Sequence, residues 1–235
     1  MKGAGVALAV LFAAAAAGHP ASSREQLDAE HARSQATAAR IENEWPLVGP
    51  SAVTRYVRKL GERLSRTAGP AVFPWSFTVI RDRAPKAFAI GGGRIYVSDG
   101  TIGECQTEAE LAAMLAHEMA HELAEHFRPD SASRQPNVVV GSIVQELDPA
   151  KELEADRLSI RILSAAGYDP HAALRMALRV QSQSYGALPH SDHRSRIKAL
   201  TELLGVARTG GSIDSEEFQT LKRQYAVGQE ERIGK

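Results

Sequence analysis

Residues 107–128 read TEAELAAMLAHEMAHELAEHFR, and they predict a helix that carries two histidines on one face. Thr107 can cap this helix, and Glu110 follows three residues later, which is the spacing of a capping box. Apolar residues recur at helical spacing at Leu111, Met114, Leu115 and Met119. His117 and His121 are four residues apart, so their side chains point the same way, about 6 Å apart along the axis. Both imidazoles can therefore reach one metal ion.

The residue after the first histidine gives the pair a more specific meaning. Glu118 lies about 100° around the helix from His117, which is a poor direction for a third metal ligand. It is a good position for contacting a metal-bound water. The pattern His117-Glu118-Met119-Ala120-His121 is the H-E-x-x-H arrangement of zinc peptidases. The alternative is a pair of histidines on a solvated helix face.

A zinc hydrolase needs a third protein ligand and one open position for water. In some zinc peptidases the helix continues as H-E-x-x-H-x-x-G-x-x-H. Here Ala124 and Phe127 occupy the positions of that glycine and of the last histidine, and His126 is one residue out of register. A carboxylate from a second helix is therefore the better candidate for the third ligand.

The segment ELEAD at residues 152–156 offers such a carboxylate. Glu152 and Asp156 share one face of the predicted helix, whereas Glu154 is turned roughly 200° from Glu152, toward solvent. We expect Glu152 to bind the metal. We expect Asp156 to accept the outer ring N–H of a ligating histidine and thereby to fix its tautomer.

The hydrophobic pattern alternates ahead of the H-E-x-x-H helix. It predicts three short strands, around residues 75–79, at 87–90 and at 94–98, with a tight turn at Gly91-Gly92-Gly93. No phosphate-loop lysine follows these glycines, so a nucleotide site is not expected. The other segments predict helices at 23–44, 51–68, 148–166, 169–180, 197–204 and 215–229. The sequence thus predicts an α+β fold, mainly helical, with a small antiparallel or mixed sheet beside the H-E-x-x-H helix.

Composition and the N-terminal segment indicate an exported protein. Lys2 and the apolar run 5–17 predict a cleavable secretory signal over residues 1–18, with a retained anchor helix as the alternative. The only cysteine is Cys105, so no intramolecular disulfide is possible, and no cysteine follows the run to accept a lipid. The 28 basic and 28 acidic residues balance, which argues against nucleic acid as a partner. We expect a bacterial periplasmic or secreted protein that is not a lipoprotein.

Together the motifs resemble peptidase family M48, in its small periplasmic form. The resemblance covers roughly residues 53–204 and is carried by H-E-x-x-H, by E-x-x-A-D at 152–156, by Ala-Phe-Ala at 87–89 and by Gly-Gly-x-Ile-Tyr-Val at 92–97. It implies a zincin-like metallopeptidase domain over residues 48–208. The residue pattern itself predicts a polar N-terminal helix at 19–47 before this domain and a charged tail at 209–235 after it. The resemblance also implies one Zn²⁺ per chain, held by His117, His121 and Glu152, with Glu118 as general base.

The resemblance points to two further residues near the metal. A family histidine lies six residues before an arginine, and His190 and Arg196 match this spacing. They are expected to stabilise the oxyanion, or, for His190, to cover the metal in a resting state. Two positions depart from the family pattern: Lys86 stands where asparagine is common, and Ser191 where proline often follows the histidine. The second departure leaves His193 as an alternative to His190.

The sequence therefore predicts a zinc endopeptidase that acts on exported, unfolded or misassembled polypeptides, with Glu118 activating a zinc-bound water. An extended substrate is expected to add to the sheet edge near residues 94–98. The alternative function is a latent zinc-binding, chaperone-like protein of the cell envelope, with outer-membrane proteins among its clients.

Overall fold

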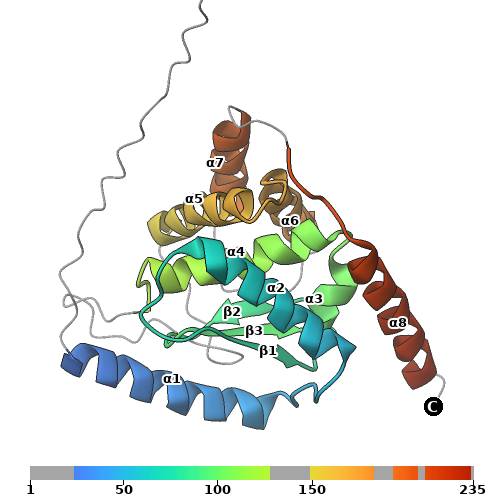
Figure 1. Ribbon diagram of the computed structural model, residues 1–235, viewed down its shortest axis with the longest axis horizontal. Helices are drawn as coiled ribbons and strands as arrows, with labels where there is room; N and C mark the ends of the chain where they lie inside the picture. Colours follow the sequence, from blue (N-terminus) through green and yellow to red (C-terminus); the bar gives the residue numbers. More distant parts are fainter. Residues whose placement is uncertain (1–23, 128–148, 183–192, 206–209, 234–235) are drawn as a thin grey trace, which may run out of the picture.

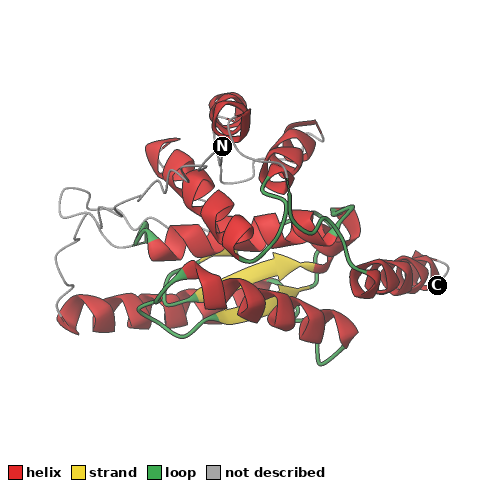
Figure 2. Cartoon of the chain, turned by 45° about the horizontal axis from the view of Figure 1, so that its top comes forward, coloured by secondary structure: helices red, strands yellow, loops and turns green. Residues whose placement is uncertain are grey.

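The structure, a computed structural model, describes residues 24–127, 149–182, 193–205 and 210–233 (Figure 1). In this part of the chain, helices lie on both sides of a three-stranded sheet (Figure 2). The helices are α1 (Arg24–Glu44), α2 (Ala52–Ala68), α3 (Asp99–Glu104), α4 (Glu108–Leu123), α5 (Pro149–Ala165), α6 (His171–Ser182), α7 (His193–Gly205) and α8 (Glu216–Ile233). The strands are β1 (Ser76–Ile80), β2 (Ala87–Ala89) and β3 (Arg94–Ser98). The predicted α+β, mainly helical fold is confirmed.

Helix α4, the H-E-x-x-H helix, begins where the sequence predicts. The Thr107 hydroxyl accepts a hydrogen bond from the Glu110 backbone N–H at 3.4 Å, so Thr107 caps the helix. The Glu110 carboxylate reaches back to the backbone N–H of Gln106 at 2.7 Å, one residue earlier than in a standard capping box. Most of α4 is buried, including His117, Glu118 and His121. The short helix α3 was not predicted, because six residues are too few to show a helical period.

The sheet is mixed, and β3 is its central strand. It pairs in parallel with β1 and antiparallel with β2, in the order β1-β3-β2. The expectation that a substrate adds near residues 94–98 is therefore wrong, because both edges of β3 are already paired. The outer side of β1 is partly covered, since Val48 donates its N–H to the Val79 carbonyl at 2.9 Å. Strand β2 is the edge strand that lies next to α4.

The two faces of the sheet belong to different clusters of apolar side chains. Ala87, Ala89, Ile95 and Val97 pack in the main core with residues of α2, α4 and α5. Phe88 and Tyr96 point to the opposite face, where they pack with Ile41 and Ala38 of α1. Figure 1 shows α1 along this face, with α4 on the other side of the sheet. Alternation along the strands thus places α1 and the H-E-x-x-H helix on opposite faces.

The glycine turn between β2 and β3 is confirmed, and carboxylates from two helices hold it. Gly91, Gly92 and Gly93 have φ angles of 84°, 65° and 73°. Glu122 of α4 accepts the N–H groups of Gly91 and Gly93 at 2.8 and 3.0 Å, and Glu30 of α1 accepts that of Gly92 at 3.3 Å. Helix α4 therefore fixes the turn that follows the edge strand β2.

We expect Gly93→Ala to destabilise the fold more than Gly69→Ala. Both glycines have positive φ, 73° and 96°, which costs an alanine roughly 1–2 kcal/mol. A Cβ on Gly93 would also lie 2.4 Å from the Pro74 carbonyl oxygen, whereas one on Gly69 meets no atom within 4 Å. Urea unfolding at one zinc concentration should give a loss at least ~2 kcal/mol larger for Gly93→Ala. Equal losses would contradict the close approach at this turn.

Some predicted segments fall outside the described residues, among them the secretory signal at 1–18. Within the described ranges, no helix has both the length and the apolar character needed to cross a membrane. The polar N-terminal helix corresponds to α1, and the charged tail contains α8.

Candidate metal centre

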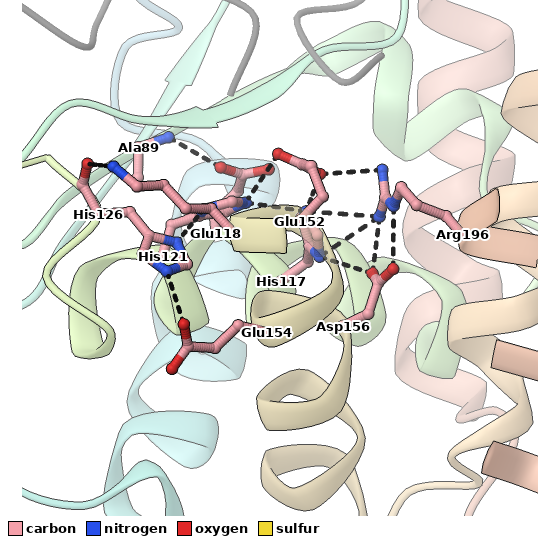
Figure 3. A network of polar contacts seen from close by, with 10 residues as sticks. Ala89, His117, Glu118, His121, His126, Glu152, Glu154, Asp156 and Arg196 are labelled. Atoms are coloured by element: carbon pink, nitrogen blue, oxygen red, sulfur yellow. Dashed lines mark hydrogen bonds and ion pairs between the residues drawn. The ribbon is translucent and has the colours of Figure 1, made fainter. Parts of the chain in front are cut away.

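Three side chains from two helices meet in the interior of the protein. His117 and His121 come from α4, and Glu152 comes from the first turn of α5 (Figure 3). The two histidine Nε2 atoms are 3.1 Å apart. The carboxylate oxygens of Glu152 lie 3.3 Å from the Nε2 atom of His117 and 3.4 Å from that of His121. All three residues are buried, so the three ligand atoms face one small, enclosed point.

These distances fit a zinc ion. Ligand atoms bound at 2.0–2.1 Å around a tetrahedral zinc lie roughly 3.3 Å from one another. The two Nε2 atoms are 3.1 Å apart, and Oε2 and Oε1 of Glu152 lie 3.3 Å from Nε2 of His117 and 3.4 Å from Nε2 of His121, respectively. One ligand atom from each residue can be chosen so that all three lie within 4.8 Å of one another. The donor set is also suitable, because two imidazoles and a carboxylate are common zinc ligands in hydrolases. The protein thus provides a buried His117-His121-Glu152 group that can bind one metal ion.

The outer nitrogen of His117 contacts a carboxylate, as the sequence predicts. Asp156 Oδ1 lies 3.1 Å from His117 Nδ1. Arg196 donates two hydrogen bonds to the Asp156 carboxylate, at 2.9 and 2.7 Å. Burial acts to raise the pKa of Asp156, but the bonds from His117 and Arg196 outweigh it and lower this pKa to about 2. Asp156 is therefore ionised at neutral pH and can hold a proton on Nδ1 of His117.

The same carboxylates act on His117 itself. Burial and the charge of Arg196 act to lower the pKa of His117, but hydrogen bonds to Asp156 and Glu152 raise it to about 9. Without a metal this site therefore takes up a proton at neutral pH. Zinc must displace that proton, because only the neutral imidazole is a ligand.

Arg196 reaches the centre from α7 and contacts its acidic residues. In addition to the two bonds to Asp156, its Nη1 atom lies 3.2 Å from Glu152 Oε2. The Arg196 guanidinium thus links Glu152, a candidate metal ligand, to Asp156, which contacts His117 (Figure 3). The structure places Arg196 close to the candidate ligands, as the sequence predicts, but aims its N–H groups at carboxylates.

Glu118 lies between the helix and the edge strand. Its Oε2 atom accepts the backbone N–H of Ala89 in β2 at 3.0 Å, and its side chain is buried. Figure 3 shows the carboxylate close to the three candidate ligands. Glu118, the base that the motif predicts, therefore lies between the three candidate ligands and the edge strand β2.

His126 and Glu154 also contact the centre, although the sequence did not predict a place for either of them there. His126 is buried, and its Nδ1 atom lies 2.8 Å from Nδ1 of His121. Its Nε2 atom lies 3.3 Å from Glu154 Oε2. The expectation that Glu154 points to solvent is thus only half correct: its side chain is 59% exposed, but it contacts His126. Burial lowers the pKa of His126, so its ring is neutral at neutral pH.

The end of α4 explains why the helical pattern missed His126. Glu125 has a φ of 58°, which turns the chain back after the helix. The backbone N–H of His126 then donates to the carbonyl of His121 at 3.0 Å. A histidine out of register for the helix is thereby brought against His121.

The predicted downstream histidine cannot be placed. His190 lies outside the described residues, and its proposed alternative His193 begins α7 with a side chain that is not described. The roles of both stay predictions.

The fold and the centre have the arrangement found in zinc metallopeptidases of the zincin type, in which an H-E-x-x-H helix beside a small sheet receives a third ligand from a second helix. The model of Peptidase family M48 matches residues 51–145, a range that includes the whole of α4. Residues 51–145 are therefore similar to this family. The match ends before Glu152, Asp156 and Arg196.

Curated proteins with related sequences carry protease names. The mitochondrial metalloendopeptidase OMA1 of Schizosaccharomyces pombe is 29% identical over 182 residues, which cover 66% of this chain and 54% of that protein. A putative beta-barrel assembly-enhancing protease of Vibrio cholerae is 28% identical over 196 residues, which cover 71% of this chain and 40% of that protein. The beta-barrel assembly-enhancing protease of Escherichia coli K12 is 24% identical over 157 residues, which cover 54% of this chain and 32% of that protein. The chain thus spans about half or less of the length of these relatives.

Proposed function

We propose that this protein is a zinc-dependent endopeptidase that uses one Zn²⁺ per chain. The observation that carries the proposal is the buried convergence of His117, His121 and Glu152 within 4.8 Å, with Glu118 close by. The two histidines and Glu152 would hold the ion. A zinc ion in such a site lowers the pKa of water and polarises a substrate carbonyl.

Glu118 would act as the general base. Its carboxylate takes the proton from the attacking water and then passes it to the nitrogen of the scissile amide, which leaves as an amine. The N–H of Ala89 orients this carboxylate through its 3.0 Å hydrogen bond. An intact glutamate here favours an enzyme over a binding protein, because binding alone requires no base.

Arg196 would support the centre indirectly. Its contacts with Asp156 and Glu152 neutralise two carboxylates that are both buried beside the metal point. Unpaired, these charges would be costly to bury. We therefore assign Arg196 a positioning role and keep His190 as the candidate for stabilising the oxyanion or for covering the metal.

The edge strand β2 would bind the substrate in extended form. Residues 86 and 90 bond to β3, through Ser98 N–H to the Lys86 carbonyl at 2.8 Å and Ile90 N–H to the Arg94 carbonyl at 3.2 Å. In an antiparallel pair, alternate residues bond to the neighbouring strand. Ala87 and Ala89, which alternate with the bonded residues 86 and 90, therefore direct their backbone N–H and C=O groups away from β3. Since Ala89 contacts Glu118, a peptide added to this edge would pass the base.

The substrates would be exported polypeptides that expose extended segments, such as unfolded or misassembled proteins. Edge addition requires an unfolded segment, and two of the relatives named above are beta-barrel assembly-enhancing proteases. The pattern at residues 1–18 supports export to the periplasm or beyond. We include outer-membrane proteins among the proposed clients.

Cleavage of casein by the purified mature protein tests the activity. We expect proteolysis that a chelator abolishes and that one equivalent of Zn²⁺ restores, because the metal point is built from protein ligands alone. Gel analysis of the fragments and metal analysis of the same samples are the measurements. Zinc binding without cleavage would instead support the alternative, a latent zinc-binding quality-control protein.

A further inference from the structure

The two candidate histidine ligands have different partners behind them. His117 contacts Asp156, a buried carboxylate that Arg196 also holds. His121 contacts a second histidine, His126, which in turn contacts the partly exposed Glu154. We propose that His126 and Glu154 are positioning residues that fix the tautomer of His121 and thereby strengthen zinc binding. This inference rests on the proposed zinc site but not on peptidase activity.

The contacts among His121, His126 and Glu154 indicate which ring nitrogens carry protons when His121 binds a metal. To bind a metal, His121 must present the lone pair of Nε2, so its proton resides on Nδ1. That N–H requires an acceptor, and Nδ1 of His126 lies 2.8 Å away. A neutral His126 that accepts at Nδ1 carries its own proton on Nε2. It can donate that proton to Glu154 Oε2, which lies at 3.3 Å.

The surrounding structure holds His126 in the orientation that this scheme needs. The residue is 4% exposed, and the turn at Glu125 with the backbone bond from His126 N–H to the His121 carbonyl fixes its main chain. Lys151 Nζ donates to the His126 carbonyl at 3.4 Å, which ties the turn to the start of α5. Glu154 lies on the same helix as the candidate ligand Glu152. Helix α5 thus supplies the candidate ligand Glu152 and also Glu154, which contacts His126 behind the other candidate ligand His121.

The two sides of the centre should therefore respond differently to substitution. A charged carboxylate directly behind a ligand gives a stronger hydrogen bond than a neutral histidine does. The His126–Glu154 contact is also longer and more exposed than the His117–Asp156 contact, at 3.3 against 3.1 Å. Loss of His126 should thus matter more than loss of Glu154, because only His126 touches a ligand.

Zinc affinity of the purified apoprotein, measured by competition with a chromogenic chelator, tests the proposal. We expect His126→Leu to weaken zinc binding by about 10–100-fold, the usual effect of removing a hydrogen-bond partner of a ligand. His126→Asn should restore most of the affinity, because its amide oxygen can replace Nδ1 as acceptor. Glu154→Leu should weaken binding by a smaller factor, roughly 2–10-fold. His31→Leu on α1 and Glu202→Leu on α7 are matched controls at exposed positions.

Thermal unfolding of the apoproteins separates positioning from general stability. Unchanged unfolding temperatures, together with lower zinc affinity and rescue by asparagine, are the expected result. Wild-type affinity in His126→Leu would overturn the proposal. If that variant does not fold, wild-type affinity in Glu154→Leu would overturn it. A wild-type protein that binds zinc but leaves casein intact would refute the proposed peptidase function only.

Discussion

Replacing Glu118 with glutamine is expected to abolish proteolysis and to leave zinc binding intact. Glutamine is isosteric and its amide oxygen can still accept the N–H of Ala89, now bonded to Glu118 at 3.0 Å, so the contact with β2 survives. An amide cannot take a proton from water, and loss of a general base typically costs 10²- to 10⁴-fold in rate. Casein cleavage and zinc content, measured on the same preparation, are the two readouts.

The control for this substitution is Glu62→Gln, which makes the same chemical change at an exposed position of α2. It should match the wild type in both readouts. Chelator-sensitive cleavage by Glu118→Gln at more than about a tenth of the wild-type rate would rule out Glu118 as the base. Loss of zinc together with activity would instead place Glu118 among the metal ligands.

The features that follow from local periodicity could be predicted from the sequence. The H-E-x-x-H helix, the helix of Glu152 and Asp156 and the three strands each depend on residues close together in the chain. The contact of Asp156 with a ligating histidine also follows from the sequence, because Glu152 and Asp156 lie four residues apart on one face of α5. The structure identifies that histidine as His117. The sequence also predicts the helix at 23–44, which is α1, but it does not specify the sheet face that α1 covers.

The features that depend on distant residues could not be predicted. Strand order is one of them, since hydrophobic alternation is the same for a central strand and an edge strand. The partners of Arg196 are another: Asp156 lies 40 residues away, and no local pattern indicates that pairing. The His126–Glu154 contact requires the left-handed turn at Glu125, and glutamate gives no signal for a positive φ. The substrate edge was therefore placed on the wrong strand, and Glu154 was assigned to solvent.

Substitution of Glu152 should remove the metal itself. Glu152 is fully buried, and its two oxygens lie 3.3 and 3.4 Å from the two histidine Nε2 atoms. Glu152→Ala removes one of three protein ligands, so zinc affinity should fall by more than the roughly 10–100-fold typical of a residue behind a ligand. Metal analysis after dialysis against trace zinc should show about one zinc per wild-type chain and almost none in the variant. Casein cleavage should be lost in parallel.

The comparison with other acidic residues makes this result specific. Glu202→Ala, at an exposed position of α7, should keep its zinc, whereas Glu154→Ala should show the smaller loss expected of a positioning residue. Glu152→Ala also removes a partner of Arg196, 3.2 Å away, so circular dichroism must show that the variant is folded. A folded Glu152→Ala protein with a full equivalent of zinc would transfer the third ligand to another residue. The expected ranking is Glu152, then Glu154, then Glu202. Glu152 contacts both candidate histidine ligands, Glu154 contacts His126 behind one of them, and Glu202 is exposed on α7, so one series of metal measurements tests the centre as a whole.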